Sequence, residues 1–594
     1  MRPSCPPPRI GASDLQALHG GPTCYCRLVT GETSEGTASA NDNAGPSRSR
    51  ARWAVLALLA LLLGATSPYF EAFISDNERP RLLQAMALVD SGETAIDGPA
   101  SRGLRPGADV ARADFPGARL HPNKPPGGTL PALLAYGLLL TFGPAAPTLV
   151  AFTALARLLG ALAPTLLLIA VAWRRFGDRA SAPALIAASF AYALATPASS
   201  YAMLLYGHQL TACTLFAGVV LLVGRPGHRP SAALSFVGGL LCALGITVEY
   251  GAVFAGLPIA AFLLWRARRD GPSGLVRAGA ALAGALIPVA ALAAYHDHAF
   301  GSPWSTSYHH VIVEDFAQKH GRGLLGLHLP TPSSLYEVLL SPWGGLLPWA
   351  PVLLVALAAG VHLARAPLSE FTPAAPSTAE PPGPSPDALA ADRRAELRLH
   401  LAIFCVWLLV VLGLTQTGGW RVGPRYLVAA FPFLLLPLAW AFERARSRAP
   451  WLIALTATSL AGAFVNGLAG RLFPFLVPEG SPVRDQLLPL LGEGAKPWAV
   501  LTWGPAALVW PLVILGLLAL FACLAACVAE EGELPSAKAR ALGLGVVLAA
   551  AFTLTSVALP DRALRQERTF DMLTKIQAST PGLEREPRRL PALE

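Results

Sequence analysis

The sequence is poor in charged side chains. Only 14% of its 594 residues are Asp, Glu, Lys or Arg, whereas 53% are hydrophobic. This composition is typical of a protein that crosses a membrane many times. The formal net charge is +9, but the basic residues lie in short clusters between apolar runs and no nucleic-acid-binding motif is present. We therefore exclude a nucleic-acid partner and interpret the clusters as cytoplasmic loops.

Cysteine is also scarce, with eight residues in the whole chain. Three lie in the polar N-terminal region and five lie in apolar runs, so none falls in a segment that we expect outside the membrane. This distribution excludes a disulfide framework. Residues 1–50 lack the basic, apolar and small-residue order of a cleavable signal. We interpret them as a disordered cytoplasmic tail, or as residues upstream of the true start.

Long apolar runs fill most of the remaining chain. A membrane-spanning helix needs about 20 apolar residues. The runs predict about 13 transmembrane helices with the N-terminus inside. We expect them at 53–70, 148–173, 182–199, 210–223, 232–248, 251–265, 275–295, 344–363, 399–415, 427–442, 451–468, 501–528 and 541–559. The run 129–142 is short, and counting it as a span would put the basic turn 174–179 outside, so it is expected to be interfacial or re-entrant.

A proline- and alanine-rich stretch divides the chain. We expect a tail at 1–50, a catalytic membrane module at 51–364 with outer loops at 70–147 and 296–343, a cytoplasmic linker at 365–398, C-terminal membrane helices at 399–559 and an outer tail at 560–594. The linker shows no periodic apolar pattern, which is typical of a connection without regular structure.

The first outer loop gathers polar residues at one membrane face, where charges usually mark function. It carries, in order, Asp76, Glu78, Arg79 and the run Lys124-Pro125-Pro126. Residues 79–89 between them have apolar side chains at helical spacing. This spacing predicts a short amphipathic helix that lies on the membrane surface.

This ordered set, directly after the first span, resembles the GT-C superfamily of membrane glycosyltransferases. The likeness is to bacterial enzymes of the protein O-mannosyltransferase and lipid A aminoarabinose transferase type. It implies an all-α GT-C fold in the bacterial inner membrane with an extracytoplasmic active site. It also implies transfer of a sugar from a polyprenyl-phosphate donor to a glycan, lipid or protein acceptor. Asn123 replaces the acid of the aminoarabinose type, so that sugar and a lipid A acceptor are not implied.

The resemblance also implies roles for the motif residues. Asp76, with Glu78, is the candidate catalytic base that removes a proton from the acceptor as it attacks the anomeric carbon. Arg79 and Lys124 are candidates for the leaving lipid phosphate, which needs cations where negative charge develops. Two structural alternatives stay open. Ser75 and Glu78 also fit a helix capping box, and Lys124 also fits an interfacial lysine that extends to water.

Further candidates lie at the outer ends of later spans. Arg425, in the glycine-rich turn 418–426, suits a phosphate contact, although an ordinary turn is the alternative. The candidate acceptor or pocket residues are His208, Glu249, Tyr250, Tyr308 and Tyr426. Glu249 has no basic neighbour within a helical turn along the chain and equally fits a solvated helix end.

Neither a metal nor a cofactor besides the sugar donor is predicted. The second outer loop is rich in histidine, but the spacing fits no standard zinc site. Two other function classes stay open: a transporter or flippase for lipid-linked sugars, and an inactive relative that serves as an assembly factor. Transporters tend to show internal repeats and charges at the middle of the membrane. This sequence shows no repeat, and its unusual charges lie at one face.

Overall fold

The computed structural model describes most of the chain. The described residues are 46–65, 75–143, 147–225, 227–314, 317–318, 326–371, 385–414, 419–478, 480–492, 509–529 and 534–558. Almost all of them belong to one compact unit, Arg48–Glu594. The expected tails at 1–50 and 560–594 lie wholly or almost wholly outside the described residues.

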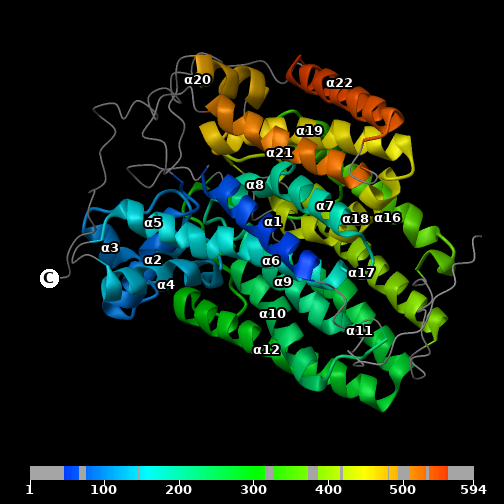
Figure 1. Cartoon of the computed structure of the whole chain (residues 1–594). Coiled ribbons are helices and arrows are strands. Elements are labelled where there is room, and N and C mark those ends of the chain that lie inside the picture. Colours follow the sequence, from blue (N-terminus) through cyan, green and yellow to red (C-terminus); the bar gives the residue numbers. More distant parts are fainter. Residues whose placement is uncertain are drawn as a thin grey trace, which may run out of the picture. The chain divides into compact units, whose positions relative to one another are not determined.

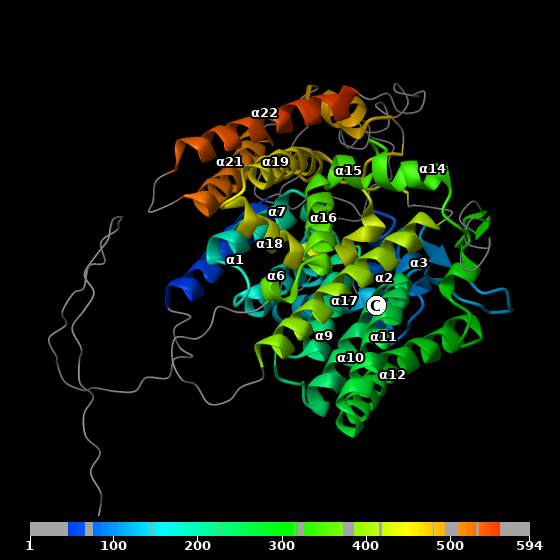
Figure 2. The same ribbon diagram turned by 90° about the vertical axis from the view of Figure 1, so that its right-hand side faces the viewer.

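Helices dominate this unit (Figures 1 and 2). The longer ones are α1 (Pro46–Gly64), α2 (Arg79–Ser91), α4 (Leu130–Phe142), α5 (Leu149–Arg157), η2 (Leu158–Leu162), α6 (Ala163–Phe176), α7 (Ala182–Leu194), α9 (His208–Val223), α10 (Ala232–Val248), η3 (Tyr250–Ala255), α11 (Gly256–Asp270), α12 (Pro272–Phe300), α16 (Pro351–Arg365), α17 (Pro386–Leu412), η7 (Arg425–Leu434), α18 (Leu435–Ala445), α19 (Ala449–Leu472), α21 (Val509–Val528) and α22 (Ser536–Ala558). The shorter elements are α3 (Asp97–Ser101), β1 (Val110–Ala111), β2 (His121–Pro122), η1 (Pro126–Thr129), α8 (Ala198–Tyr201), η4 (Ser307–His310), α14 (Pro332–Leu335), η5 (Tyr336–Leu340), α15 (Leu346–Trp349), η6 (Leu368–Phe371), η8 (Pro482–Leu487) and α20 (Leu488–Gly492).

The structure confirms an all-α membrane protein. Among the described residues, eight helices are long and apolar enough to cross a membrane, and five further apolar helices are shorter. A helix lies at every expected span from 148–173 onward. The end of the first expected span, 53–70, lies partly outside the described residues, so the count of about 13 spans stays a prediction.

The span Arg425–Ala445, made of η7 and α18, is the most enclosed. Of its most apolar stretch 83% is buried, against 22% for α12. Phe431 and Phe433 on η7 pack with Phe404 of α17 in the main hydrophobic core. The first two residues of η7 are Arg425 and Tyr426. Because this span is tightly packed, their backbone is held in place at its outer end.

The prediction that residues 79–89 lie on the membrane surface is wrong. The helix forms as α2, but Leu82 and Met86 of its apolar stripe are fully buried in protein. They belong to a separate hydrophobic cluster with Tyr136 of α4 and Phe152 of α5. These two residues of the stripe therefore pack against other helices, whereas its third residue, Val89, is exposed, as is Leu134 of α4.

The expected linker 365–398 is helical over its last residues. Only 372–384 fall outside the described residues, and α17 begins at Pro386, with the Ser385 hydroxyl accepting a hydrogen bond from an N–H of its first turn. Helices on both sides of this stretch pack in the same compact unit. Apolar periodicity did not predict this part of α17, because its first residues are charged.

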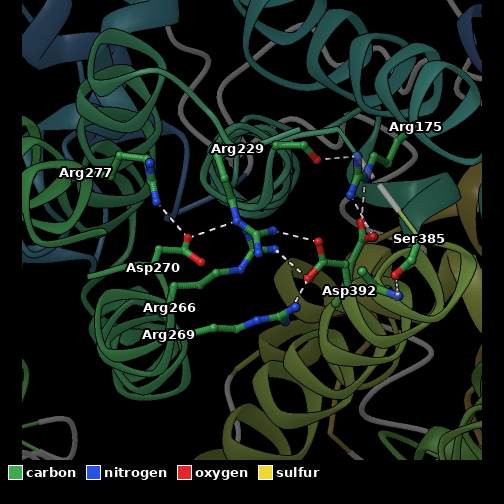
Figure 3. Close-up of polar contacts among 11 residues, drawn as sticks. Arg175, Arg229, Arg266, Arg269, Asp270, Arg277, Ser385 and Asp392 are labelled. Carbon is green, nitrogen blue, oxygen red and sulfur yellow. Dashed lines mark hydrogen bonds and ion pairs between the residues drawn. The ribbon is translucent and has the colours of Figure 1, made fainter. Parts of the chain in front are cut away.

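Ion pairs hold this start of α17 against arginines from the ends of α6 and α11 and from the loop before α10 (Figure 3). Glu396 accepts hydrogen bonds from Arg175 at 2.6 and 2.7 Å. Asp392 lies 2.6 Å from Arg229 and 3.1 Å from Arg269. Both carboxylates are buried, and a buried charge needs a partner of opposite sign. These ion pairs explain why the charged residues at the start of α17 form part of the helix.

Candidate functional site

Glu78 anchors the first outer loop. Its two carboxylate oxygens accept hydrogen bonds from Arg157 Nε at 2.8 Å and Nη2 at 2.7 Å. The first oxygen also accepts the Leu205 N–H at 2.7 Å. Both side chains of the pair are buried, so the carboxylate offers no face to a substrate. These contacts favour a positioning role at the start of α2, and the catalytic role expected for Glu78 stays a prediction.

The capping-box alternative is also wrong. Glu78 precedes the first turn of α2 with helical dihedrals and makes no side-chain cap. The Ser75 hydroxyl instead donates to the Tyr206 hydroxyl at 3.0 Å. Ser75 therefore ties the loop to the segment that precedes α9.

Asp76 lies beside Arg79, as its spacing predicted, and is exposed. The chain at Gly107 passes close to both side chains, and the Ala108 N–H donates to the carboxylate. Gly107 has a φ of +77°, and a Cβ there would lie 2.5 Å from Asp76 Oδ1. Partial burial raises the pKa of Asp76 above its usual range; Arg79 opposes this shift and Asp109 adds to it.

Asp109, which the sequence did not single out, pairs with Lys124. Strands β1 and β2 pair antiparallel, with Val110 opposite Pro122, and so bring Asp109 to the lysine. Lys124 Nζ lies 3.4 Å from the Asp109 carboxylate. Asn123 links them, because its side chain accepts from Lys124 at 2.8 Å and donates to Asp109 at 3.2 Å.

The charge of Asp109 is maintained by several cations. Burial raises its pKa, but Lys124, Arg425 and Arg81 together hold that pKa below the usual range. Asp109 therefore stays ionised and is a weaker base than Asp76.

Arg81 is a second residue that the sequence analysis missed. Its side chain is buried, and its Nη1 donates to the Leu205 carbonyl at 2.7 Å and to Asn77. Burial lowers its pKa, whereas Glu249 and Asp109 act in the opposite direction. Arg81 lies on the helix predicted to be amphipathic, where a charged residue was expected on the solvated face.

Arg425 and Tyr426, at the start of η7, reach this group from the other end of the chain. The Arg425 guanidinium lies 4.9 Å from the Tyr426 ring centroid and 5.8 Å from that of Tyr206. Its Nη2 donates to the Tyr426 hydroxyl at 3.1 Å. The charge of Arg425 acts on Asp109, which joins the η7 residues to the first outer loop.

The second outer loop supplies Tyr308. Lys124 Nζ lies 5.7 Å from the Tyr308 ring centroid. Tyr308 packs edge to face on Tyr250, with centroids 5.1 Å apart. The Tyr250 hydroxyl lies 2.8 Å from His296 Nε2 and 3.0 Å from the Ser307 hydroxyl. The aromatic pair therefore forms one side of the site.

Glu249 is not the isolated acid that its sequence neighbours suggested. His208 at the start of α9 contacts its carboxylate through Nδ1. The same imidazole packs edge to face on Tyr201, 4.9 Å between centroids. Glu249 also acts on the charge of Arg81, so it belongs to the cluster rather than to a solvated helix end.

A further buried arginine, Arg421, lies in the turn before η7. Its guanidinium is 3.9 Å from the ring centroid of Trp343 in the second outer loop. Burial lowers the pKa of Arg421 to about 10, with Arg425 as a second cause. Gly344 leaves the space that this guanidinium fills.

The site therefore brings together the first outer loop with α2, the start of α9, the end of α10, the second outer loop and the start of η7. We name the side chains that meet there, namely Asp76, Arg79, Arg81, Asp109, Lys124, His208, Glu249, Tyr250, Tyr308, Arg425 and Tyr426, the outer cluster. It combines cations suited to an anion, an accessible carboxylate and aromatic rings. Within the described residues, no three His, Cys, Asp or Glu side chains gather as metal ligands.

No protein-family model matches the chain, and no curated protein matches it significantly. Among solved structures, the chain is similar to ArnT from Cupriavidus metallidurans, whose crystal structure is described as bound to undecaprenyl phosphate. The TM-score is 0.42 and the sequence identity 16%, over 85% of this chain and 77% of that chain.

Proposed function

We propose that the protein is a GT-C-type glycosyltransferase. It transfers a sugar from a polyprenyl-phosphate donor to an acceptor on the extracytoplasmic face of the bacterial inner membrane. The observation that carries this proposal is the position of Lys124 and Arg425 around Asp109. Two cations from distant parts of the chain meet next to an accessible carboxylate, which is what transfer from a lipid phosphate requires.

The cations serve the donor phosphate. Lys124 is partly accessible, with 14% of its side chain exposed, and Asp109 holds it in place until the donor arrives. A phosphate that approaches Lys124 is also attracted by the positive charge of Arg425. Arg79 lies beside Asp76. Charge-assisted hydrogen bonds to an oxyanion are stronger than neutral ones. They stabilise the leaving group as its negative charge develops.

Asp76 serves as the base. Its raised pKa makes it a better proton acceptor than an ordinary aspartate,. The acceptor hydroxyl or amine gives its proton to Asp76 while its O or N atom forms a bond to the anomeric carbon. The bond from that carbon to the phosphate oxygen breaks, and the electron pair leaves with the lipid phosphate next to Lys124.

The aromatic side of the outer cluster binds the sugar or the acceptor. Lys124 Nζ lies over the ring of Tyr308, and Tyr250 packs edge to face on that ring, which places a ring system next to the phosphate subsite. The His208–Glu249 pair is a further polar contact of the outer cluster. Aromatic side chains give large contact areas with a polar group at one end, and this suits a carbohydrate.

A transporter or flippase is the weaker interpretation. Alternating access requires a site near the middle of the membrane between moving halves. The outer cluster instead lies in loops and helix starts at one end of the helices. An inactive assembly factor would share this geometry with an active transferase. Only a measurement of transfer activity distinguishes these two functions.

The test is binding of a fluorescent polyprenyl-phosphate sugar to the purified full chain. We expect saturable binding by the wild type and at least about tenfold weaker binding by Lys124→Ala, because a charge-assisted contact is lost. Arg119→Ala is the matched control, since Arg119 lies in the same loop but is exposed and paired with Glu93. Equal binding by Lys124→Ala and the wild type, or no binding by folded wild type, would remove the proposal's main support.

A further inference from the structure

A buried arginine lies away from the outer cluster, near the end of α19. Arg471 is 7% exposed and lines a small, partly open pocket. The other lining residues include Leu62 and Leu63 of α1 and Val513 and Gly516 of α21. Figures 1 and 2 show α1, α19 and α21 in this part of the molecule.

The charge of Arg471 has no acidic partner among the residues that the structure describes. Its Nη1 donates to the Gly467 carbonyl of its own helix at 3.1 Å, and its Nε has no hydrogen-bond partner there. None of the pocket's lining residues is acidic. A buried charge without a counter-ion is costly, and a bound anion would offset that cost.

Three other polar atoms near this pocket are also unsatisfied. Asn466 Oδ1 and the hydroxyls of Ser199 and Ser200 have no hydrogen-bond partner among the described residues. Asn466 and Ser199 line the pocket. Ser200 lies next to it, because a Cβ on Gly470 would be 3.4 Å from its hydroxyl. Hydroxyl groups beside an arginine suit phosphate oxygens, which accept several hydrogen bonds.

The pocket lies where lipid chains have access. The outward faces of the two flanking helices are apolar and exposed, with Leu61 of α1 at 61% and Leu518 of α21 at 59%. Leu62 and Leu63, next to Leu61, face the pocket. An occupant with a charged head and an apolar chain would therefore place its head at Arg471 and its chain between α1 and α21.

We propose that this pocket binds the phosphate of a membrane lipid, with Arg471 as the ligand of the phosphate and Ser199 as a hydrogen-bond donor. The site is separate from the outer cluster and shares no lining residue with it. Helix α8 separates them, since Ser199 faces the pocket whereas Tyr201 packs on His208 of the outer cluster. The pocket does not depend on the proposed transferase activity.

The test uses the purified full chain in detergent with three probes: phosphatidylglycerol, polyprenyl phosphate and inorganic phosphate. Native mass spectrometry measures binding, and thermal unfolding measures the stabilisation that each probe gives. We expect at least one lipid to bind, and to bind Arg471→Ala at least about tenfold more weakly. Inorganic phosphate is expected to bind more weakly than that lipid, because it lacks the chain.

Three controls make the outcome specific. Arg471→Lys keeps the charge and is expected to retain part of the binding. Gly516→Val adds methyl groups beside Arg471 Nη2, which lies 3.6 Å from a Cβ at that position, and should block the pocket with the arginine intact. Lys124→Ala should bind phosphatidylglycerol like the wild type, which distinguishes this site from the proposed donor site.

Loss of lipid binding in Arg471→Ala can be distinguished from loss of folding. Without added lipid, Arg471→Ala is expected to unfold at the same temperature as the wild type or higher, since it loses an uncompensated charge. The variant should lose only the stabilisation that lipid gives. Equal lipid binding and stabilisation in Arg471→Ala and the wild type would overturn the proposal. Binding of inorganic phosphate without any lipid would overturn it as well.

Discussion

At the scale of single residues, the two acids of the loop motif have different surroundings. Glu78 is enclosed and fully hydrogen-bonded by Arg157 and Leu205. Asp76 is exposed and has a raised pKa. Burial and partners, rather than the motif, therefore decide which acid can take a proton.

Replacing Glu78 is expected to change stability more than chemistry. Glu78→Gln leaves Arg157 buried without its counter-charge, and breaking such a pair costs roughly 3–5 kcal/mol. Denaturant unfolding of the purified protein measures this loss. The double variant Glu78→Gln with Arg157→Met should recover part of it. A Glu78→Gln protein as stable as the wild type but without transfer activity would return Glu78 to a catalytic role.

The pH dependence of transfer should report Asp76. The base acts only when ionised, so kcat/KM falls as pH decreases through its pKa, and the raised pKa places this acid limb above the range of an ordinary aspartate,. Arg79 lowers that pKa, so Arg79→Ala should move the limb to still higher pH. An acid limb that stays in place in Arg79→Ala would contradict this assignment, and Arg119→Ala is the control.

At the scale of elements, helices were predictable and their polar contacts were not. Apolar length placed helices such as α10 and α12, because a membrane span is a long-range compositional signal. Asp109 and Arg81 were missed because their roles arise from the pairing of β1 with β2 and from the burial of α2. These are tertiary contacts between segments that carry no pattern of their own.

The start of α17 gives a prediction at this scale. Glu396→Gln with Asp392→Asn removes the two acids that hold this segment to arginines on other helices. The segment should then detach, because buried arginines lose their counter-charges. Limited proteolysis of 385–398 measures this as faster cleavage by several-fold. The exposed Asp387 serves as the control, and cleavage of the double variant at the rate of Asp387→Asn would contradict the account.

At the scale of the whole molecule, the outer cluster depends on the packing of one compact unit. The first outer loop supplies Lys124 and Asp109, whereas η7 supplies Arg425 from the most enclosed span. The sequence predicted both cations but not that Asp109 lies between them. The main hydrophobic core holds η7 against α9 and α17, and the first outer loop packs in separate hydrophobic clusters of the same compact unit.

The most direct test of the account is a double-mutant cycle on Lys124 and Arg425, with affinity for a polyprenyl-phosphate sugar as the readout. If both cations bind one donor phosphate, their effects are coupled. We expect a coupling free energy of about 1 kcal/mol or more between Lys124→Ala and Arg425→Ala. The pair Arg119→Ala and Arg425→Ala should show none. Additive effects of Lys124→Ala and Arg425→Ala on donor affinity would contradict a shared phosphate site.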